Sequence, residues 1–281
     1  MAVSATELQA ARTLLAPALA QRGGLCVLTG ADMSAESGIA TFRDARDPAP
    51  TAPSALIPQG ERLALGRPGG QPGYWARFDP MELASEDGFR ANPQRVWDWY
   101  AERRAGVQQA QPNASHLALA HFAQRQPGVL TLITQNVDDL HQRAGNVDAI
   151  QLHGDILEDR WLDTCARHAR GGNVCDPQWA QAARPPRCAD CGNLVRPGVV
   201  WFGEPLPLRA INAAEAAVTA CAALLVVGTS GAVWPAAGLV GRARRAGARV
   251  IVVNPNFSEI DEEAHQLLAG TAAQVLPLLL A

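Results

Sequence analysis

The feature that most constrains the fold is a repeated alternation between short apolar runs and segments with helical spacing. Apolar runs occupy residues 25–29, 128–133, 222–227 and 248–253. Each run has the length and composition of a buried strand, and the segments between them can hold crossover helices. Such an alternation predicts an α/β fold built on a doubly wound parallel sheet.

The remaining segments predict helices and one insertion. Helical spacing or capping residues predict helices at residues 5–20, 92–104, 115–126, 235–245 and 261–269. Asn92 and Pro93 suit the cap and first turn of the second of these helices. Residues 45–73 hold a dense set of prolines and glycines with little periodicity. We expect that stretch to be a flexible surface insertion.

The composition describes an ordinary globular protein. Of the 281 residues, 48% are hydrophobic and 18% are charged. The net charge of −3, without a basic stretch, argues against a nucleic-acid partner. We find no signal peptide and no run of about 20 apolar residues, so we expect a cytoplasmic enzyme without a membrane partner. All 24 basic residues are arginines, so the chain has no lysine of its own.

Polar residues gather where the second apolar run ends. Residues 134–139 read Thr-Gln-Asn-Val-Asp-Asp, and Leu152, His153 and Gly154 follow soon afterwards. An open α/β sheet places its ligands at the carboxyl ends of its strands, so this histidine and these amides and carboxylates are candidates for a site. The alternative is a helix cap and an ordinary loop histidine.

Two glycine-containing loops follow apolar runs, at residues 30–38 and 227–235. Backbone N–H groups of such loops can bind a pyrophosphate, and small residues let the backbone approach a ligand closely. The first loop lacks G-x-G-x-x-G spacing, which argues against a hydride-transferring dehydrogenase. Two such loops in one sheet favour a nucleotide site. Asn254 follows the last run, where a ribose or base could bind, although Asn-Pro is also common in turns.

Taken together, these motifs resemble the sirtuin family. They are Gly30–Arg43, Thr134–Asp138, Leu152–Gly154, Val200–Glu204, Gly228–Ser230 and Asn254, in family order over roughly residues 20–275. The resemblance implies a Rossmann-like NAD-binding domain from residues 1–154 and 201–281, and a small zinc-ribbon module at residues 155–200. It also implies NAD-dependent removal of acyl groups from lysines of proteins or peptides, giving nicotinamide and O-acyl-ADP-ribose.

The resemblance assigns a role to each matched position. His153 matches the general base, a task that suits an imidazole with its ordinary pKa of about 6.5. Residues 200–204 match a strand that pairs with the substrate's peptide backbone. The cofactor positions are Gly30, Ala31, Ser34, Phe42, Arg43, Gln135, Asn136, Asp138, Gly228, Thr229, Ser230 and Asn254, and the substrate positions are Ala84, Tyr100, Arg103, Val200, Trp201, Phe202 and Gly203.

The predicted helix at 92–104 suggests which acyl group is removed. Tyr100 and Arg103 are three residues apart, so they share a face of that helix. They match the Tyr-x-x-Arg pair of the sirtuin class that prefers succinyl and malonyl groups, and Ala84 matches a small residue that leaves room for a longer acyl chain. A guanidinium group can form two parallel hydrogen bonds to a carboxylate, and the hydroxyl of a phenol can add another. Without the resemblance, a buried tyrosine and a solvated arginine would be the simpler interpretation.

The cysteines predict a zinc site in the inserted module. The chain has six cysteines, which in a cytoplasmic protein are more often metal ligands or buried residues than disulfides. Cys188 and Cys191 have the C-x2-C spacing of half a zinc ribbon. Either His168 or Cys175 could join Cys165 upstream, and we expect four thiolates, from Cys165, Cys175, Cys188 and Cys191. A degenerate site without metal is the alternative.

Two residues depart from the family pattern in the first glycine loop. Asp32 replaces a usual glycine, and a carboxylate beside the pyrophosphate would repel it while its Cβ would crowd the turn. Either the loop turns Asp32 outward or the affinity for NAD is reduced. Ala40 replaces a usual proline, which loosens the loop. The alternatives are therefore an ADP-ribosyltransferase or NAD hydrolase on the same fold, and a non-catalytic NAD-sensing protein.

Overall fold

A central sheet of parallel strands organises the molecule. The computed structural model describes residues 3–41, 79–165, 167–174 and 184–281. The strands lie in the order β3-β2-β1-β6-β7-β8, and every pair is parallel. Their bounds are β1 Leu25–Thr29, β2 Leu130–Thr134, β3 Ile150–Gln151, β6 Ala223–Val227, β7 Arg249–Asn254 and β8 Gln266–Ala269. The prediction of a doubly wound parallel sheet is confirmed.

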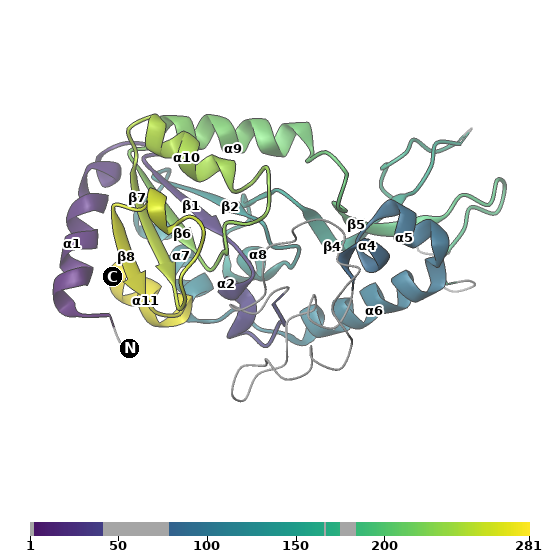
Figure 1. Ribbon diagram of the computed structural model, residues 1–281, viewed down its shortest axis with the longest axis horizontal. Coiled ribbons are helices and arrows are strands. Elements are labelled where there is room, and N and C mark those ends of the chain that lie inside the picture. The colour runs from purple at the N-terminus through teal and green to yellow at the C-terminus, as the bar shows by residue number, and fades with distance from the viewer. Residues whose placement is uncertain (1–2, 42–78, 166, 175–183) are drawn as a thin grey trace.

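Helices cover both faces of this sheet, which is why its central strands β1 and β6 are buried at every position. On β1, Leu25 and Val27 join one hydrophobic cluster while Cys26 and Leu28 join the other, as the two-residue period of a strand requires. The first cluster includes residues of α1 (Ala5–Leu15), α7 (Ala114–Arg125) and α11 (Ala272–Leu279), and the second includes residues of α9 (Leu208–Ala220) and α10 (Gly238–Arg245). In Figure 1, α9 and α10 lie above the sheet and α11 lies below it.

Local signals explain the first helix. Ser4 caps α1 in a capping box with Glu7. The helix stops at Leu15, where a 3-10 helix at Ala16–Ala20 with a proline at its start replaces the end of the single helix expected over residues 5–20. Within the ranges that the structure describes, no helix is both long enough and apolar enough to cross a bilayer.

A second unit lies at the opposite end of the molecule from α1 (Figure 1). Its antiparallel strands are β4 (Gly154–Trp161) and β5 (Val195–Val199), and its helices are α4 (Pro80–Leu83), α5 (Glu86–Ala91) and α6 (Pro93–Gln109). One hydrophobic cluster joins these helices and strands, and it includes Phe89, Ile156 and Trp201. The helical segment 80–109 therefore packs against the inserted module. The domain limits expected at residues 154 and 201 stay a prediction.

One helix expected from the sequence is wrong. Residues 261–269 form no continuous helix: a 3-10 turn at Asp261–Glu263 precedes β8, whose Gln266 pairs with Ile251 of β7. This tertiary pairing outweighs the local helical spacing. Residues 200–204 follow β5, which ends at Val199, and Phe202 forms an isolated bridge with Ser85; their pairing with a substrate peptide stays a prediction.

Candidate active site

The two glycine loops meet at the carboxyl ends of β1 and β6, where the strand order changes direction. The backbone N–H of Gly30 donates to the Val227 carbonyl oxygen, and that of Asp32 donates to the Gly228 carbonyl oxygen, each at 3.0 Å. A Cβ on Gly30 would lie 2.6 Å from the Cβ of Thr229, so no larger residue fits between the loops. The two loops therefore form one surface at the edge of the sheet.

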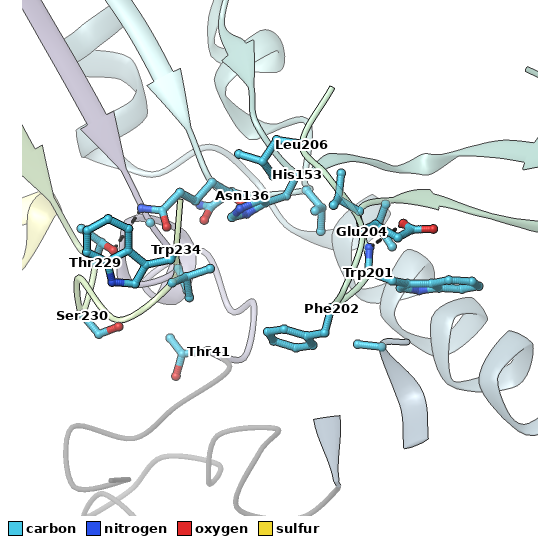
Figure 2. Close-up of a pocket in the computed structure, with 18 of the residues that line it drawn as sticks. Thr41, Asn136, His153, Trp201, Phe202, Glu204, Leu206, Thr229, Ser230 and Trp234 are labelled. Atoms are coloured by element: carbon cyan, nitrogen blue, oxygen red, sulfur yellow. Dashed lines mark hydrogen bonds between the residues drawn. The ribbon is translucent and has the colours of Figure 1, made fainter. Parts of the chain in front are cut away.

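A pocket opens at this edge and extends to the second unit. Figure 2 shows Thr229, Ser230 and Trp234 on one side of it, Trp201 and Phe202 on the other, and Asn136 and His153 between them. The predicted site residues that line the pocket are Gly30, Ala31, Ala84, Tyr100, Arg103, Gln135, Asn136, His153, Val200, Trp201, Phe202, Gly203, Gly228, Thr229 and Ser230. Cofactor and substrate positions thus share one pocket between the two units, as expected for a substrate cleft.

His153 lies between β3 and β4, and its ring is held in one orientation. Its Nδ1 is 2.8 Å from the carbonyl oxygen of Gln135. A carbonyl oxygen only accepts, so Nδ1 must carry the proton and the lone pair of Nε2 is left for a base. Burial lowers the pKa of His153, and the hydrogen bond to Gln135 opposes that effect. The imidazole is therefore neutral at pH 7, as a general base requires.

Ser34 links two residues of the polar motif that follows β2. It lies in a one-turn helix, α2 (Asp32–Ala35), within the first glycine loop. Its Oγ donates to Oδ2 of Asp138 at 2.9 Å and accepts from Nδ2 of Asn136 at 3.0 Å. All three residues are buried, and burial raises the pKa of Asp138. Asn136 lines the pocket, whereas Ser34 and Asp138 do not. Ser34 holds the Asn136 amide in place, and Asp138 in turn holds the Ser34 hydroxyl.

Asn254 and Gln135 both bind Thr229 in the second glycine loop. Nδ2 of Asn254 donates to the Thr229 carbonyl oxygen at 2.9 Å, and Nε2 of Gln135 donates to Thr229 Oγ1 at 3.1 Å. Oδ1 of Asn254 is buried with no hydrogen-bond partner among the described residues. An orphaned buried oxygen costs about 1–3 kcal/mol unless a donor reaches it. Asn254 does not line the pocket itself, but a hydroxyl or amine of an adenosine bound beside Thr229 would supply that donor, so this part of the sheet edge fits NAD.

Two histidines that the sequence patterns did not single out lie buried beside the site. His116 of α7 and His141 of α8 (Leu140–Ala144) have ring centroids 4.8 Å apart. Nε2 of His141 is 3.0 Å from Thr29 Oγ1, which donates to Thr134 Oγ1 at 2.9 Å. The Asn136 backbone N–H also donates to Thr134 Oγ1, at 3.0 Å. Burial lowers the pKa of His116 to about 4 and that of His141 to about 3, so both rings are neutral.

The pocket lining includes a tyrosine and an arginine of α6, the helix that Asn92 caps. Tyr100 and Arg103 both line the pocket, and both are buried. The Tyr100 hydroxyl accepts a hydrogen bond from Nε1 of Trp201 at 3.1 Å. Cζ of Arg103 lies 4.6 Å from the ring centroid of Trp99. Burial raises the pKa of Tyr100, so its hydroxyl keeps its proton at pH 7.

Three cysteines form a cluster in the second unit. The Sγ atoms of Cys165, Cys188 and Cys191 all lie within 4.8 Å of one another. Thiolates around a tetrahedral zinc ion, with Zn–S distances of about 2.3 Å, fit that spacing, so these residues would hold zinc. His168 is not part of the cluster, and its ring stacks on Trp161 with the centroids 4.0 Å apart. The arrangement favours thiolates over a histidine knuckle.

Other predicted positions lie outside the described residues, namely Phe42, Arg43, Cys175 and the insertion at 45–73. Conversely, the pocket is also lined by residues that were not predicted as ligands: Asp32, Thr41, Val137, Val199, Glu204, Leu206, Val233, Trp234 and Pro235. Trp234 stands in the second glycine loop, so its place in that motif was a usable signal. Nothing in the local sequence marks Leu206, which only the fold brings to the pocket.

Comparisons with known proteins identify the family of the chain. Residues 68–235 match the sequence profile of the Sir2 family. A protein of Ralstonia nicotianae named NAD-dependent protein deacylase is 50% identical over 255 residues, which cover 91% of this chain and 90% of that protein. A protein of Methylococcus capsulatus with the same name is 44% identical over 257 residues, covering 91% of each chain.

Solved structures share the fold over nearly the whole chain. A Sir2 homologue in complex with NAD is 35% identical with a TM-score of 0.74, covering 100% of this chain and 94% of that one. Sir2Tm bound to a propionylated peptide is 27% identical with a TM-score of 0.70, covering 93% and 94%. The parallel sheet, the pocket at its switch point and these matches together show that the chain belongs to the Sir2 family.

Proposed function

We propose that this chain is an NAD-dependent protein-lysine deacylase that prefers succinyl and malonyl groups to acetyl groups. The observation that carries the proposal is the placement of Tyr100 and Arg103 in the same pocket as His153. A cationic fork and a phenol in a pocket that also holds a neutral histidine suit an acyl group that ends in a carboxylate. The relatives named NAD-dependent protein deacylases support the NAD-dependent reaction.

The chain's own residues supply binding, orientation and a base. NAD, when bound, supplies the ribose carbon that receives the acyl oxygen as nicotinamide leaves. His153 holds its Nδ1 proton on Gln135, which leaves Nε2 free to take a proton from a ribose hydroxyl. Asn136, held by Ser34, presents an amide of fixed orientation. Gly228, with a φ of +64°, lets the loop backbone approach a phosphate closely.

Charge at the acyl end explains the proposed preference. Arg103 stays protonated throughout the working pH range, and at 9% exposure its charge is only weakly screened by water. A succinyl or malonyl carboxylate can pair with this charge, whereas an acetyl group offers it nothing. Loss of a hydrogen bond to a charged group costs about 1.5–3 kcal/mol, which corresponds to roughly a tenfold to hundredfold weaker interaction. Ala84 adds no bulk beyond its Cβ, which leaves room for the longer chain.

Mass spectrometry of the protein with NAD and matched acetyl-, malonyl- and succinyl-lysine peptides tests the proposal. We expect free lysine peptide together with succinyl-ADP-ribose, and faster turnover of the succinyl than of the acetyl peptide. Arg103→Met should reduce succinyl activity by roughly tenfold to a hundredfold, and acetyl activity much less. Arg95→Met is a matched control on the same helix, because the Arg95 side chain is 52% exposed.

The outcomes separate the alternatives. Equal losses on both peptides in Arg103→Met would remove the acyl preference and leave a general deacylase. Hydrolysis of NAD that does not depend on the peptide, without acyl transfer, would favour an NAD hydrolase instead. Transfer of ADP-ribose to the peptide would favour an ADP-ribosyltransferase.

A further inference from the structure

A buried chain of contacts leads from Arg196 through Trp201 to the hydroxyl of Tyr100. We infer that Arg196 and Trp201 are positioning residues that direct the Tyr100 hydroxyl toward the carboxylate of an acyl group. Neither side chain was assigned such a role by the sequence, which placed Trp201 only in a peptide-binding segment. The inference rests on the proposed preference for succinyl and malonyl groups.

Arg196 of β5 is fixed in a single orientation. Its side chain is 8% exposed and forms a two-pronged ion pair with Glu204, in which Nη2 donates to Oε2 at 3.0 Å and Nη1 donates to Oε1. Nη2 also donates to the Val199 carbonyl oxygen at 2.6 Å, and Nε donates to that of Pro197 at 3.2 Å. These hydrogen bonds offset the cost of removing the Arg196 guanidinium from water, and they leave the group little freedom to move.

This ion pair holds Trp201. Cζ of Arg196 lies 3.5 Å from the centroid of the Trp201 ring, so the guanidinium stacks on the indole. The Trp201 backbone N–H donates to Oε2 of Glu204 at 2.9 Å, the dashed line beside Trp201 in Figure 2. The ring of Phe89 contacts the indole with the centroids 5.2 Å apart. Trp201 is 2% exposed, so its indole cannot turn without breaking these contacts.

The indole N–H decides where the Tyr100 proton points. Nε1 of Trp201 donates to Tyr100 Oη at 3.1 Å, which uses the oxygen as an acceptor. A phenol has a single proton to donate, and no atom of the described residues accepts the one on Tyr100. Tyr100 lines the pocket, so that proton is available to a ligand there. A carboxylate oxygen is the strong acceptor that a succinyl or malonyl group offers, and the methyl end of an acetyl group has none.

Trp201→Phe tests the indole N–H, because it removes that donor and keeps an aromatic ring beside Arg196. We expect the ratio of KM for a succinyl-lysine peptide to KM for the matched acetyl-lysine peptide to rise by about fivefold to tenfold, the effect of one lost hydrogen bond. Trp161→Phe is the matched control, since Trp161 is a buried tryptophan of β4 in a different hydrophobic cluster. A ratio that Trp201→Phe leaves within about twofold of the parent value would overturn the inference.

Arg196→Lys tests whether the arginine acts through Trp201. Lysine keeps a positive charge beside Glu204 but loses the planar stack and the fork. The KM ratio should rise by about threefold in the parent background and should not rise further in the Trp201→Phe background, because the contact that Arg196 supports is already lost. If the double variant instead showed a KM ratio raised by the product of the two single effects, Arg196 would not act through Trp201.

A spectroscopic readout makes the test independent of turnover. In 1H–15N spectra of protein labelled at tryptophan, the Trp201 indole resonance is assigned by its loss in Trp201→Phe. Arg196→Lys should shift this resonance without any ligand, and an unshifted resonance would overturn the inference. A parent protein that prefers acetyl peptides would refute the proposed acyl preference and this inference with it. A parent that prefers succinyl peptides, with an unaltered KM ratio in Trp201→Phe, would refute the inference alone.

Discussion

Acidification should destabilise this protein through the buried pair His116 and His141. Burial lowers the pKa of His116 to about 4 and that of His141 to about 3, and the proximity of His116 contributes to the second shift. A histidine of the unfolded chain has a pKa of about 6.5. Because the folded pKa values are lowered, the unfolded state binds protons first as the pH falls. Stability therefore decreases from about pH 6.5 down to the folded pKa values.

The size of the effect follows from these values. At pH 5 each unfolded histidine holds a proton that its folded counterpart does not hold. One pKa unit corresponds to about 1.36 kcal/mol, so about 1.5 units give roughly 2 kcal/mol per histidine and roughly 4 kcal/mol for the pair. The stability lost at pH 5 depends mainly on the pKa of the unfolded histidines. It changes little with the pKa in the folded state, as long as that pKa stays below about 5. Burial raises the pKa of Asp138, which stabilises the folded state in acid and reduces the net loss.

Urea unfolding at pH 7 and pH 5 measures this difference. Between the two pH values the parent should lose roughly 2 kcal/mol more of its free energy of unfolding than His141→Gln, and the same holds for His116→Gln. His121→Gln is the matched control, because His121 lies on the same helix as His116 but is exposed. A His141→Gln variant with the pH dependence of the parent would refute the reasoning, since the neutral buried ring would then not be its cause.

Four further predictions concern the pocket and the cysteine cluster. Asp32→Gly removes a carboxylate that lines the pocket beside the glycine loops, and relief of about 1 kcal/mol of repulsion should lower KM for NAD roughly fivefold; an unchanged KM would mean that Asp32 does not act on the phosphates. His153→Ala should lower kcat by about 10²–10⁴-fold while calorimetry still detects NAD binding. Because burial lowers the pKa of His153 from 6.5, the acid limb of the parent's kcat profile should lie below pH 6.5, and a limb above it would contradict the assignment. Cys188→Ser should contain less zinc than the parent in a metal analysis and should have a lower melting temperature, whereas His168→Ala should retain its zinc. Loss of zinc from both variants would mean that His168 is a zinc ligand.

Local patterns were enough to predict four strands of the central sheet, β1, β2, β6 and β7, and many of the residues that line the pocket. The run at 222–227 is apolar at every position and the run at 25–29 is apolar up to Thr29, and only a strand covered on both faces needs that pattern. Parallel strands end at the same edge of a sheet, so motifs as distant as Gly30, Asn136 and Gly228 had to converge there. The two glycine loops favoured a nucleotide at that edge, and the resemblance to sirtuins predicted a general base there.

Only the tertiary structure decided the contacts between distant segments. Residues 266–269 pair with β7 as a strand, although the local spacing favoured a helix. The helices of residues 80–109 pack on β4 and β5, and this packing brings Tyr100 to a tryptophan 101 positions away in the sequence. His141 meets Thr29 across 112 positions. Periodicity reports how a residue relates to its near neighbours, so it carries no information on hydrogen bonds that form only when the chain folds back on itself.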